Sequence, residues 1–438
     1  MTIPVLTQFR IEPQASGLVH LVFDCPGKSM NLLSNVATHE FSQFVQWLRT
    51  ADVKGVVMRS GKPTGFCAGA DLTELGVAYD MIAAVPPADR FDIAFHHFFP
   101  LSHAIRKLET AGKPVAAAIA GVALGGGCEL AMGAHYRVAT VSQRAMLGLP
   151  ECALGLLPGA GGTQRMPRLV GVELGLDVLL HGRNLQGADA LRAGLVNAVV
   201  AEGAEVAAAE AWLLSDKAHA VQPWDETGAR PLPHRELAGA LERHRTREIG
   251  RMLGHEPAPL AILDCVELGV IQPMDGAIRS EMAVFSHLIQ RREARNMIRT
   301  MFLGKQAFDK AGRNGDLDAA VTGAVEDIAV ATAAALAREP ALARAGFGDQ
   351  TAEINPVQDR VGPGYWLESQ PALIAALADL GTTCSAGLDG LDLTKQLQLD
   401  HAVVRAGLLP GYIGGATGLV ALLASNHPVM PSPAHLSG

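Results

Sequence analysis

The stretch GVALGGGCE, at positions 121–129, decides the fold class of this 438-residue chain. It follows the apolar run Pro114–Ala120, which predicts a buried strand, and Gly125–Ala134 predicts a turn followed by a helix. Glycine and alanine carry no large side chain, so such a turn lets the backbone approach a ligand closely. N–H groups at the start of a helix point outward with a favourable dipole, which suits an anionic oxygen. A single glycine cluster after a strand is more often only a tight turn.

A second turn of small residues lies upstream, in FCAGAD at positions 66–71, after the predicted buried strand Lys54–Met58. Active-site groups of parallel sheets gather on the turns at the strand ends. The two turns together can therefore supply two backbone N–H donors to one oxygen. Such a pair is an oxyanion hole, and it stabilises the enolate of a thioester.

Two carboxylates make this interpretation more specific. Glu129 lies on the first turn of the helix that opens at Gly126, and Glu151 follows Pro150 in the otherwise apolar stretch 146–154. A carboxylate in apolar surroundings is costly unless it is used or paired. Taken one at a time, Glu129 can be explained as a helix N-terminal residue and Glu151 as a satisfied polar residue. As a pair beside an oxyanion hole, they can hold one water and move its proton.

The remaining pattern predicts an α/β fold with a mostly parallel sheet, followed by a mainly helical region. In the first part we expect a strand over Gly17–Phe23 and helices over Ser34–Arg49 and Phe91–Leu108. From about Glu202 helical periodicity dominates. The predicted helices there are Ala204–Ser215, Arg235–Leu253, Pro257–Val270, one long helix Met274–Phe302, and helical stretches within Arg313–Gly348 and Ala372–Ala424, with Asp349–Tyr365 irregular.

Composition narrows the possible partners. Hydrophobic residues make up 49% of the chain and charged residues 18%, which is typical of a globular protein. The net charge of -8 gives no basic field for nucleic acid or an anionic membrane. No secretory signal or membrane anchor is visible, and the six cysteines lack CxxC spacing, so we expect reduced thiols in a cytoplasmic protein without a metal site.

Four motifs in order resemble the crotonase (enoyl-CoA hydratase/isomerase) superfamily. They are AGAD at 68–71, GGGCE at 125–129, LPE at 149–151 and PGAGGTQR at 158–165. The resemblance implies a crotonase-type ββα spiral in which Ala70 and Gly126 donate their N–H groups to a thioester oxygen. It also implies that Ala68 contacts the adenine end of coenzyme A, and that the two glutamates are the acid–base pair of a 2-enoyl-CoA hydratase. We take PGAGGTQR to be mainly a structural loop.

Three further residues lie near these motifs. Lys28 and Lys113 can meet the phosphates of coenzyme A, although a solvated lysine is the ordinary case. Asp71 is expected to cap or brace its turn without touching the substrate. The expected ligand is therefore an acyl-CoA, with no metal and no redox cofactor.

The spacing from Glu129 to Glu151, together with residues 257–264 and 293–305, resembles the hydratase half and linker helix of multifunctional fatty-acid β-oxidation enzymes. In those enzymes an NAD-binding GxGxxG follows the linker, but here Lys305 precedes neither a strand nor that fingerprint. The cluster Gly411–Gly418 has the wrong spacing. We therefore predict a spiral core at 1–200, the helical end and linker helix at 201–305, and a helical extension of unknown role at 306–438.

Several alternatives stay open. The same site can serve double-bond isomerisation, carbon–carbon bond cleavage or decarboxylation of a CoA thioester, or the chain can be a non-catalytic CoA-binding partner subunit. The acyl group cannot be read from the sequence. A homo-oligomer is possible, because crotonase relatives often form trimers.

Overall fold

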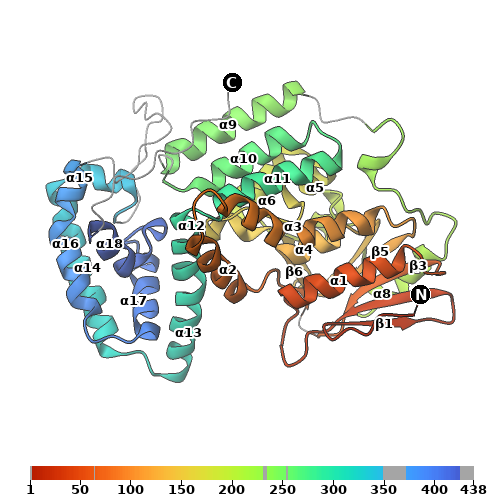
Figure 1. Cartoon of the computed structure of the whole chain (residues 1–438), viewed down its shortest axis with the longest axis horizontal. Coiled ribbons are helices and arrows are strands. Elements are labelled where there is room, and N and C mark those ends of the chain that lie inside the picture. The colour runs from red at the N-terminus through yellow and green to blue at the C-terminus, as the bar shows by residue number, and fades with distance from the viewer. Residues whose placement is uncertain (1, 64, 230–233, 253–254, 349–370, 425–438) are drawn as a thin grey trace. The chain divides into compact units, whose positions relative to one another are not determined.

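The computed structural model describes residues 2–63, 65–229, 234–252, 255–348 and 371–424 (Figure 1). The chain forms two compact units. The first comprises Met1–Cys152, Leu156–Leu241 and Ala261–His287, and the second comprises Ala153–Gly155, Glu242–Leu260 and Leu288–Gly438. The predicted segment Asp349–Tyr365 lies outside the described residues, and the predicted boundaries at residues 200 and 305 stay a prediction.

A six-stranded sheet forms the centre of the first unit, in the order β1-β2-β3-β5-β7-β10. The β1 strand pairs antiparallel with β2, and all other neighbours are parallel. Every residue of β2 and β5 is buried, as expected for parallel strands covered on both faces. The strands are β1 (Phe9–Pro13), β2 (Leu18–Phe23), β3 (Gly55–Ser60), β5 (Val115–Ile119), β7 (Tyr136–Thr140) and β10 (Ala198–Val200).

A second sheet has four short strands in the order β4-β6-β8-β9. Its strands are β4 (Gly65–Cys67), β6 (Val122–Leu124), β8 (Met146–Gly148) and β9 (Leu185–Gln186). Along the chain, β4, β6 and β8 come directly after β3, β5 and β7 of the first sheet. Three times in succession, one strand of the large sheet leads into one strand of the small sheet and then into a helix. This repeat confirms the predicted α/β fold, which is a ββα spiral. In each repeat a turn follows the strand of the small sheet, which is β4, β6 or β8.

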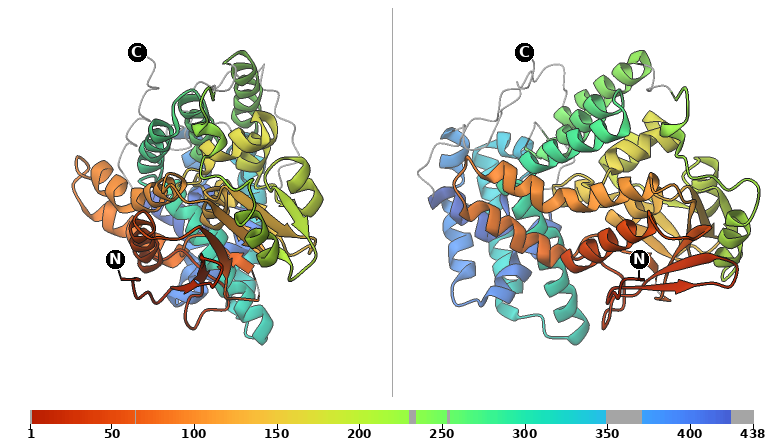
Figure 2. Two further views of the ribbon diagram at one scale, coloured as in Figure 1. Left: turned by 90° about the vertical axis from the view of Figure 1, so that its right-hand side faces the viewer. Right: turned by 45° about the vertical axis from the view of Figure 1, so that its right-hand side comes forward.

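Helices cover both sheets of the first unit. Helix α1 packs on α3 and lies beside the N-terminal strands (Figure 2), and α8 packs on β3, β5 and β7. The helices of this unit include α1 (Asn35–Leu48), α2 (Leu72–Ala84), α3 (Arg90–Glu109), α4 (Gly126–Met132), α5 (Gly162–Val170), α6 (Val172–His181), α7 (Gly187–Arg192), α8 (Glu205–Leu213) and α11 (Met274–Leu288), with short 3₁₀ turns η1 (Pro150–Leu154) and η2 (Pro223–Asp225). The α9 (His234–Met252) and α10 (Pro257–Gly269) helices each run from one unit into the other.

The prediction of one long helix over Met274–Phe302 is wrong. Helix α11 ends at Leu288, a turn closes through a hydrogen bond from Arg291 N to Leu288 O, and Arg291 is extended. This geometry lets the Arg291 guanidinium bind the Glu293 carboxylate, although side chains two positions apart cannot face each other on a helix. The chain continues as α12 (Arg292–Met297) and a π-helix, η3 (Ile298–Gly304).

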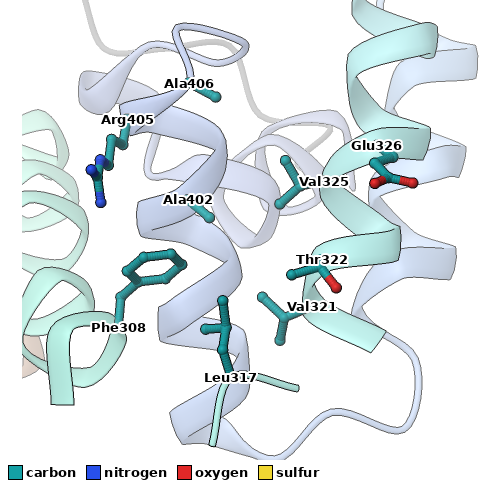
Figure 3. A pocket seen from close by; sticks show the side chains of 9 residues that line it. All are labelled: Phe308, Leu317, Val321, Thr322, Val325, Glu326, Ala402, Arg405 and Ala406. Atoms are coloured by element: carbon teal, nitrogen blue, oxygen red, sulfur yellow. The ribbon is translucent and has the colours of Figure 1, made fainter. Parts of the chain in front are cut away.

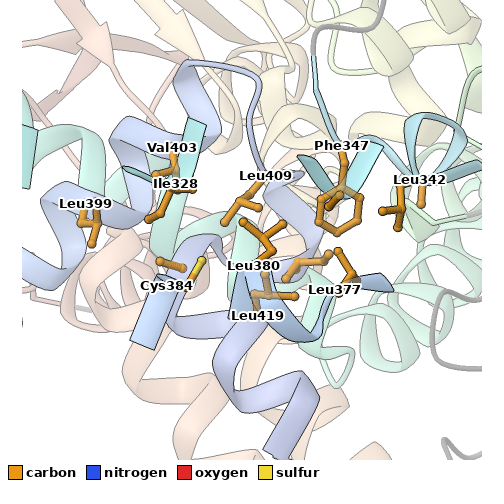
Figure 4. Packing of buried hydrophobic residues seen from close by; sticks show 14 of the residues in the cluster. Ile328, Leu342, Phe347, Leu377, Leu380, Cys384, Leu399, Val403, Leu409 and Leu419 are labelled. Carbon is orange, nitrogen blue, oxygen red and sulfur yellow. The ribbon is translucent and has the colours of Figure 1, made fainter. Parts of the chain in front are cut away.

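The second unit is helical and has its own hydrophobic core. Leu377, Leu380 and Leu419 are fully buried and gather with side chains of α14 and α17 (Figure 4). Its helices, besides α12 and η3, are α13 (Lys305–Asn314), α14 (Ala319–Arg338), η4 (Pro340–Ala345), α15 (Pro371–Ala376), α16 (Ala378–Leu388), α17 (Leu393–Arg405), η6 (Gly411–Ile413) and α18 (Gly415–Ala424). The mainly helical C-terminal region is thereby confirmed.

Helix α14 is long and apolar enough to cross a bilayer by length and composition. It carries Glu326 and Asp327 near its middle, and it packs against α16 and α17. Its buried side chains, Val321, Ala324, Ile328, Thr332 and Ala335, belong to the bundle.

Candidate active site

In the turn after β4, the backbone N–H group of Ala70 points away from the neighbouring segment at Leu33. Leu33 donates its N–H to Gly69 O (2.8 Å) and accepts from Asp71 N (3.2 Å), so its two hydrogen bonds lie on either side of Ala70. In a parallel bridge of this kind the bracketed residue points its own N–H the other way. Ala70 is exposed whereas Gly69 is buried, which leaves the Ala70 amide available at the surface of the turn.

The glycine run before α4 is required by close packing. A Cβ atom on Gly125 would lie 2.7 Å from Oε1 of Glu151, and one on Gly127 would lie 2.3 Å from the carbonyl oxygen of Cys67. Gly125 also has φ +53°, a conformation that side chains rarely adopt. Gly126 is the first residue of α4, so its N–H has no acceptor within the helix.

The structure brings the two predicted N–H donors together. The Cβ position of Gly69 is 3.5 Å from Gly126 N, and the Cβ position of Gly126 is 3.9 Å from Ala70 N. Leu33 lies beside them, with its Cδ1 2.8 Å from the Cβ position of Gly126. Two outward N–H groups within a few ångströms of each other have the arrangement that an enolate oxygen requires.

Glu129 is buried and held by backbone donors. Its side chain is 2% exposed, and its Oε1 accepts hydrogen bonds from Ala160 N and Gly162 N, each at 2.7 Å. Burial raises the pKa of Glu129 to about 7, although these two donors and Arg165 oppose the change. Its other oxygen, Oε2, is the atom nearest the Cβ position of Gly126 among the atoms of this side chain.

Glu151 lies on η1, beside the start of α4. No protein partner in the described part of the chain bonds its buried Oε2 atom. Burial, and then the charge of Glu129, raises the pKa of Glu151 well above its usual range. The structure therefore brings the two glutamates to the same place, because Oε1 of Glu151 lies 2.7 Å from the Cβ position of Gly125 and Oε2 of Glu129 lies 3.9 Å from that of Gly126.

Glu281 on α11 is a buried glutamate beside the segment that holds Glu129, and the sequence did not single it out. Its carboxylate binds the backbone of the 158–165 segment, which we had taken to be a structural loop and which also holds Glu129. The signal was present, because Met274, Ile278 and Phe285 form the buried face of α11 and Glu281 falls on that same face. A carboxylate at a core position of an amphipathic helix indicates a function or a partner.

The remaining predicted residues lie near the first turn. The Ala68 side chain is exposed and its N–H donates to Asn31 O (3.0 Å). Lys28 is largely exposed, with its Nζ 4.0 Å from Oδ2 of Asp71. Asp71 caps α2 by accepting from Thr73 N (3.0 Å), which confirms the expected capping role.

A buried ion pair between Arg165 and Glu109 also holds the 158–165 segment in place. Arg165 is fully buried, binds Glu109 through Nε (2.6 Å) and donates from Nη1 to Ala160 O (2.8 Å). Glu109 also binds Arg106, which pairs with Asp225. The segment that holds Glu129 is therefore fixed by charged groups on α3 and α5.

The helical unit contains a cavity of about 410 Å³, lined mainly by apolar side chains of α13, α14 and α17 (Figure 3). Phe308, Val321 and Ala402 face it, and none of the predicted site residues lines it. The glycine cluster 411–418 is explained by packing. A Cβ on Gly414 would lie 2.8 Å from the side chain of Asn296, and one on Gly415 would lie 2.7 Å from Cβ of Asp400.

A ββα spiral of this kind, followed by a mainly helical region, is a crotonase-type fold. Residues 14–222 match the enoyl-CoA hydratase/isomerase family, and the domain that they form is of this family. The six cysteines are all buried, and no disulfide joins them.

Curated relatives include the fatty acid oxidation complex subunit alpha of Shewanella frigidimarina, 32% identical over 319 residues, and that of Shewanella loihica, 34% identical over 324 residues. Each alignment covers 70% of this chain, and the chain spans only 42% and 43% of these two relatives. Similar solved structures include Pseudomonas aeruginosa DspI, at 29% identity and TM-score 0.42, which covers 48% of this chain and 75% of that one. Another is an enoyl-CoA hydratase/isomerase family protein from Hyphomonas neptunium, at 32% identity and TM-score 0.41, covering 47% and 74%.

Proposed function

We propose that the chain binds an acyl-CoA thioester and adds water across the C2–C3 double bond of a 2-enoyl-CoA. The observation that carries this proposal is the pair formed by buried Glu129 and by Glu151, whose Oε2 atom is buried, beside the N–H groups of Ala70 and Gly126. Ala68 and Lys28, which border the same turn, are the proposed contacts of coenzyme A.

The two glutamates divide the work by protonation state. Glu129, whose pKa is about 7, is the base that takes a proton from water as the oxygen bonds to C3. Glu151, whose pKa is raised well above its usual range, is the acid that gives a proton to C2. The Ala70 and Gly126 N–H groups stabilise the negative charge on the thioester oxygen between these events. Hydration is redox-neutral and needs no redox cofactor, and in this proposal the Ala70 and Gly126 N–H groups supply the electrophilic assistance that a metal ion would otherwise give.

We further propose that the glycine cluster 411–418 is not an NAD-binding turn. The support is the glycine cluster 411–418, where the side chains of Asn296 and Asp400 occupy the space against Gly414 and Gly415. The cluster also begins as a 3₁₀ turn, η6, and not as the end of a strand.

The test is the hydration of crotonyl-CoA, followed by loss of the enoyl-thioester absorbance and by the mass gain of one water. Glu129→Gln and Glu151→Gln should each lower kcat by about 10²–10⁴-fold, since each removes one proton-transfer group. Glu40→Gln, at a buried glutamate bonded to Thr7 and Gln8, is the control and should keep the parental rate. Parental rates in both site variants would contradict the proposal, and a product of unchanged mass would indicate isomerisation.

A further inference from the structure

Glu281 and Glu129 accept hydrogen bonds from opposite faces of the same segment, residues 160–163. Its Oε1 accepts from Gly161 N (2.6 Å), and its Oε2 accepts from Thr163 N (3.0 Å) and Thr163 Oγ (2.5 Å). The amides on either side of Gly161 donate to Glu129. Gly161 has φ +95°, and a left-handed residue turns successive N–H groups toward opposite faces. Four consecutive amides at the start of α5 therefore serve two carboxylates alternately.

The carboxylates of Glu129 and Glu281 both lie at the N-terminus of α5, where the helix dipole is positive. Glu281 is 0% exposed and Glu129 is 2% exposed, so neither charge is screened by solvent. Burial, and then the charge of Glu129, raises the pKa of Glu281 to about 8. Because the repulsion is mutual, ionisation of either group opposes ionisation of the other.

Glu40 shows what the same donors do without a second carboxylate. It accepts from Thr7 N (2.9 Å), Thr7 Oγ (2.6 Å) and Gln8 N (2.7 Å), so it has two backbone amides and one threonine hydroxyl, as Glu281 has. Burial disfavours its charge, but these hydrogen bonds outweigh burial and the pKa of Glu40 is lowered. The opposite direction at Glu281 follows from deeper burial and from Glu129.

We propose that Glu281 is a positioning residue, which holds residues 160–163 so that Ala160 N and Gly162 N stay directed at Glu129. This role rests on the function proposed above for Glu129. Glu281 donates nothing to the substrate and acts only through the segment it holds. The other titratable groups that interact electrostatically with the pair are Glu151 on η1, Arg165 and Arg168 on α5, Cys128 on α4 and Cys265 on α10.

The test measures the titration of Glu129 in the full chain, by carbon NMR of protein labelled at the glutamate carboxyl carbon. Glu129→Gln assigns the resonance. Glu281→Gln keeps the shape of the side chain but replaces one accepting oxygen by an NH2 group, which cannot accept from a backbone amide. The 160–163 segment should then shift, the Ala160 and Gly162 donors to Glu129 should weaken, and the pKa of Glu129 should rise above about 7. Glu40→Gln, with the matching set of donors, should leave it unchanged.

Thr163→Val is the second variant, because it removes the hydroxyl donor and keeps both backbone amides. Both amide bonds to Glu281 remain in this variant, so the segment should shift less and the pKa of Glu129 should rise by a smaller amount than in Glu281→Gln. An unchanged titration of Glu129 in both variants would overturn the positioning role. This readout does not depend on turnover, so a wild-type chain that fails to hydrate crotonyl-CoA would contradict the proposed function and leave the titration result valid.

Discussion

At the scale of single residues, identical side chains take different protonation states because their donors differ. Glu129 has two backbone donors, whereas the buried Oε2 of Glu151 has no partner among the described residues. Hydrogen bonds to a carboxylate favour its charged form, and burial disfavours it. In the proposed reaction this difference assigns the role of base to Glu129 and the role of acid to Glu151.

This difference predicts a pH profile. Base catalysis needs ionised Glu129, so kcat/KM for crotonyl-CoA should fall about tenfold per unit below about pH 7, the pKa of Glu129. Acid catalysis needs protonated Glu151, so the rate should fall again at a higher pH. Initial rates in buffers of constant ionic strength give the profile. A rate that stays constant from about pH 8 to about pH 5 would rule out Glu129 as the base.

The sequence was sufficient for residues with a local signal and insufficient for those with a distant partner. Ala70, Gly126, Glu129 and Glu151 each lie within a small-residue turn or an apolar run, and their grouping was expected. Glu281 lies 118 positions or more from the residues it binds, so only the buried face of α11 pointed to it. Hydrogen bonds over such a separation depend on the tertiary fold, which periodicity does not describe.

At the scale of elements, each glycine at the start of α4 leaves room for a different neighbouring group. Gly127 lets α4 approach β4, because a Cβ there would lie 2.3 Å from the Cys67 carbonyl oxygen. The helix that carries Glu129 is thereby fixed against the strand that leads to Ala70. The position of Glu129 relative to Ala70 thus depends on Gly127, which has no side chain.

Gly127→Ala should therefore destabilise the fold by ~1–3 kcal/mol, as overpacking does, and should lower kcat by displacing α4. Gly76→Ala, on α2, is the matched control because no atom lies within 4 Å of the added Cβ. It should stabilise by about 0.5–1 kcal/mol through helix propensity. Urea unfolding measures both. Equal stability of the two variants would show that α4 does not rest on β4 as described.

The long helix predicted over Met274–Phe302 failed for a physical reason that belongs to this scale. The break at Ile289–Arg291 contains no glycine or proline, and Ile289 is fully buried, so the apolar pattern continues across it. The apolar periodicity therefore does not predict that the backbone of Arg291 is extended or that its guanidinium binds Glu293. By contrast, α1, α3, α4 and α10 begin and end within two residues of the predicted bounds.

At the scale of the whole molecule, the chain combines a hydratase/isomerase-family domain with a helical unit that has its own core. Leu380 is fully buried among α14, α16 and α18 in the second unit, and Leu179 is fully buried in the first. Compact units with separate cores often unfold in separate transitions. We therefore expect two transitions in calorimetry.

Leu380→Ala should lower the stability of the helical unit by about 2–5 kcal/mol through loss of apolar contacts and a residual cavity. Leu179→Ala, on α6, should cause a loss of similar size in the spiral unit. Differential scanning calorimetry should show each variant shifting a different transition. A single transition shifted equally by both variants would mean that the units unfold together.

The distribution of thiols gives a way to follow the two units without any substitution. Cys384 is the single cysteine of the second unit, and Cys25, Cys67, Cys128, Cys152 and Cys265 all belong to the first. Burial raises the pKa of Cys384 to about 12, so it reacts with an alkylating reagent only when its surroundings open. Pulsed alkylation followed by peptide mass spectrometry therefore reports, in the unmodified chain, how often each unit opens and whether an acyl-CoA ligand slows one of them or both.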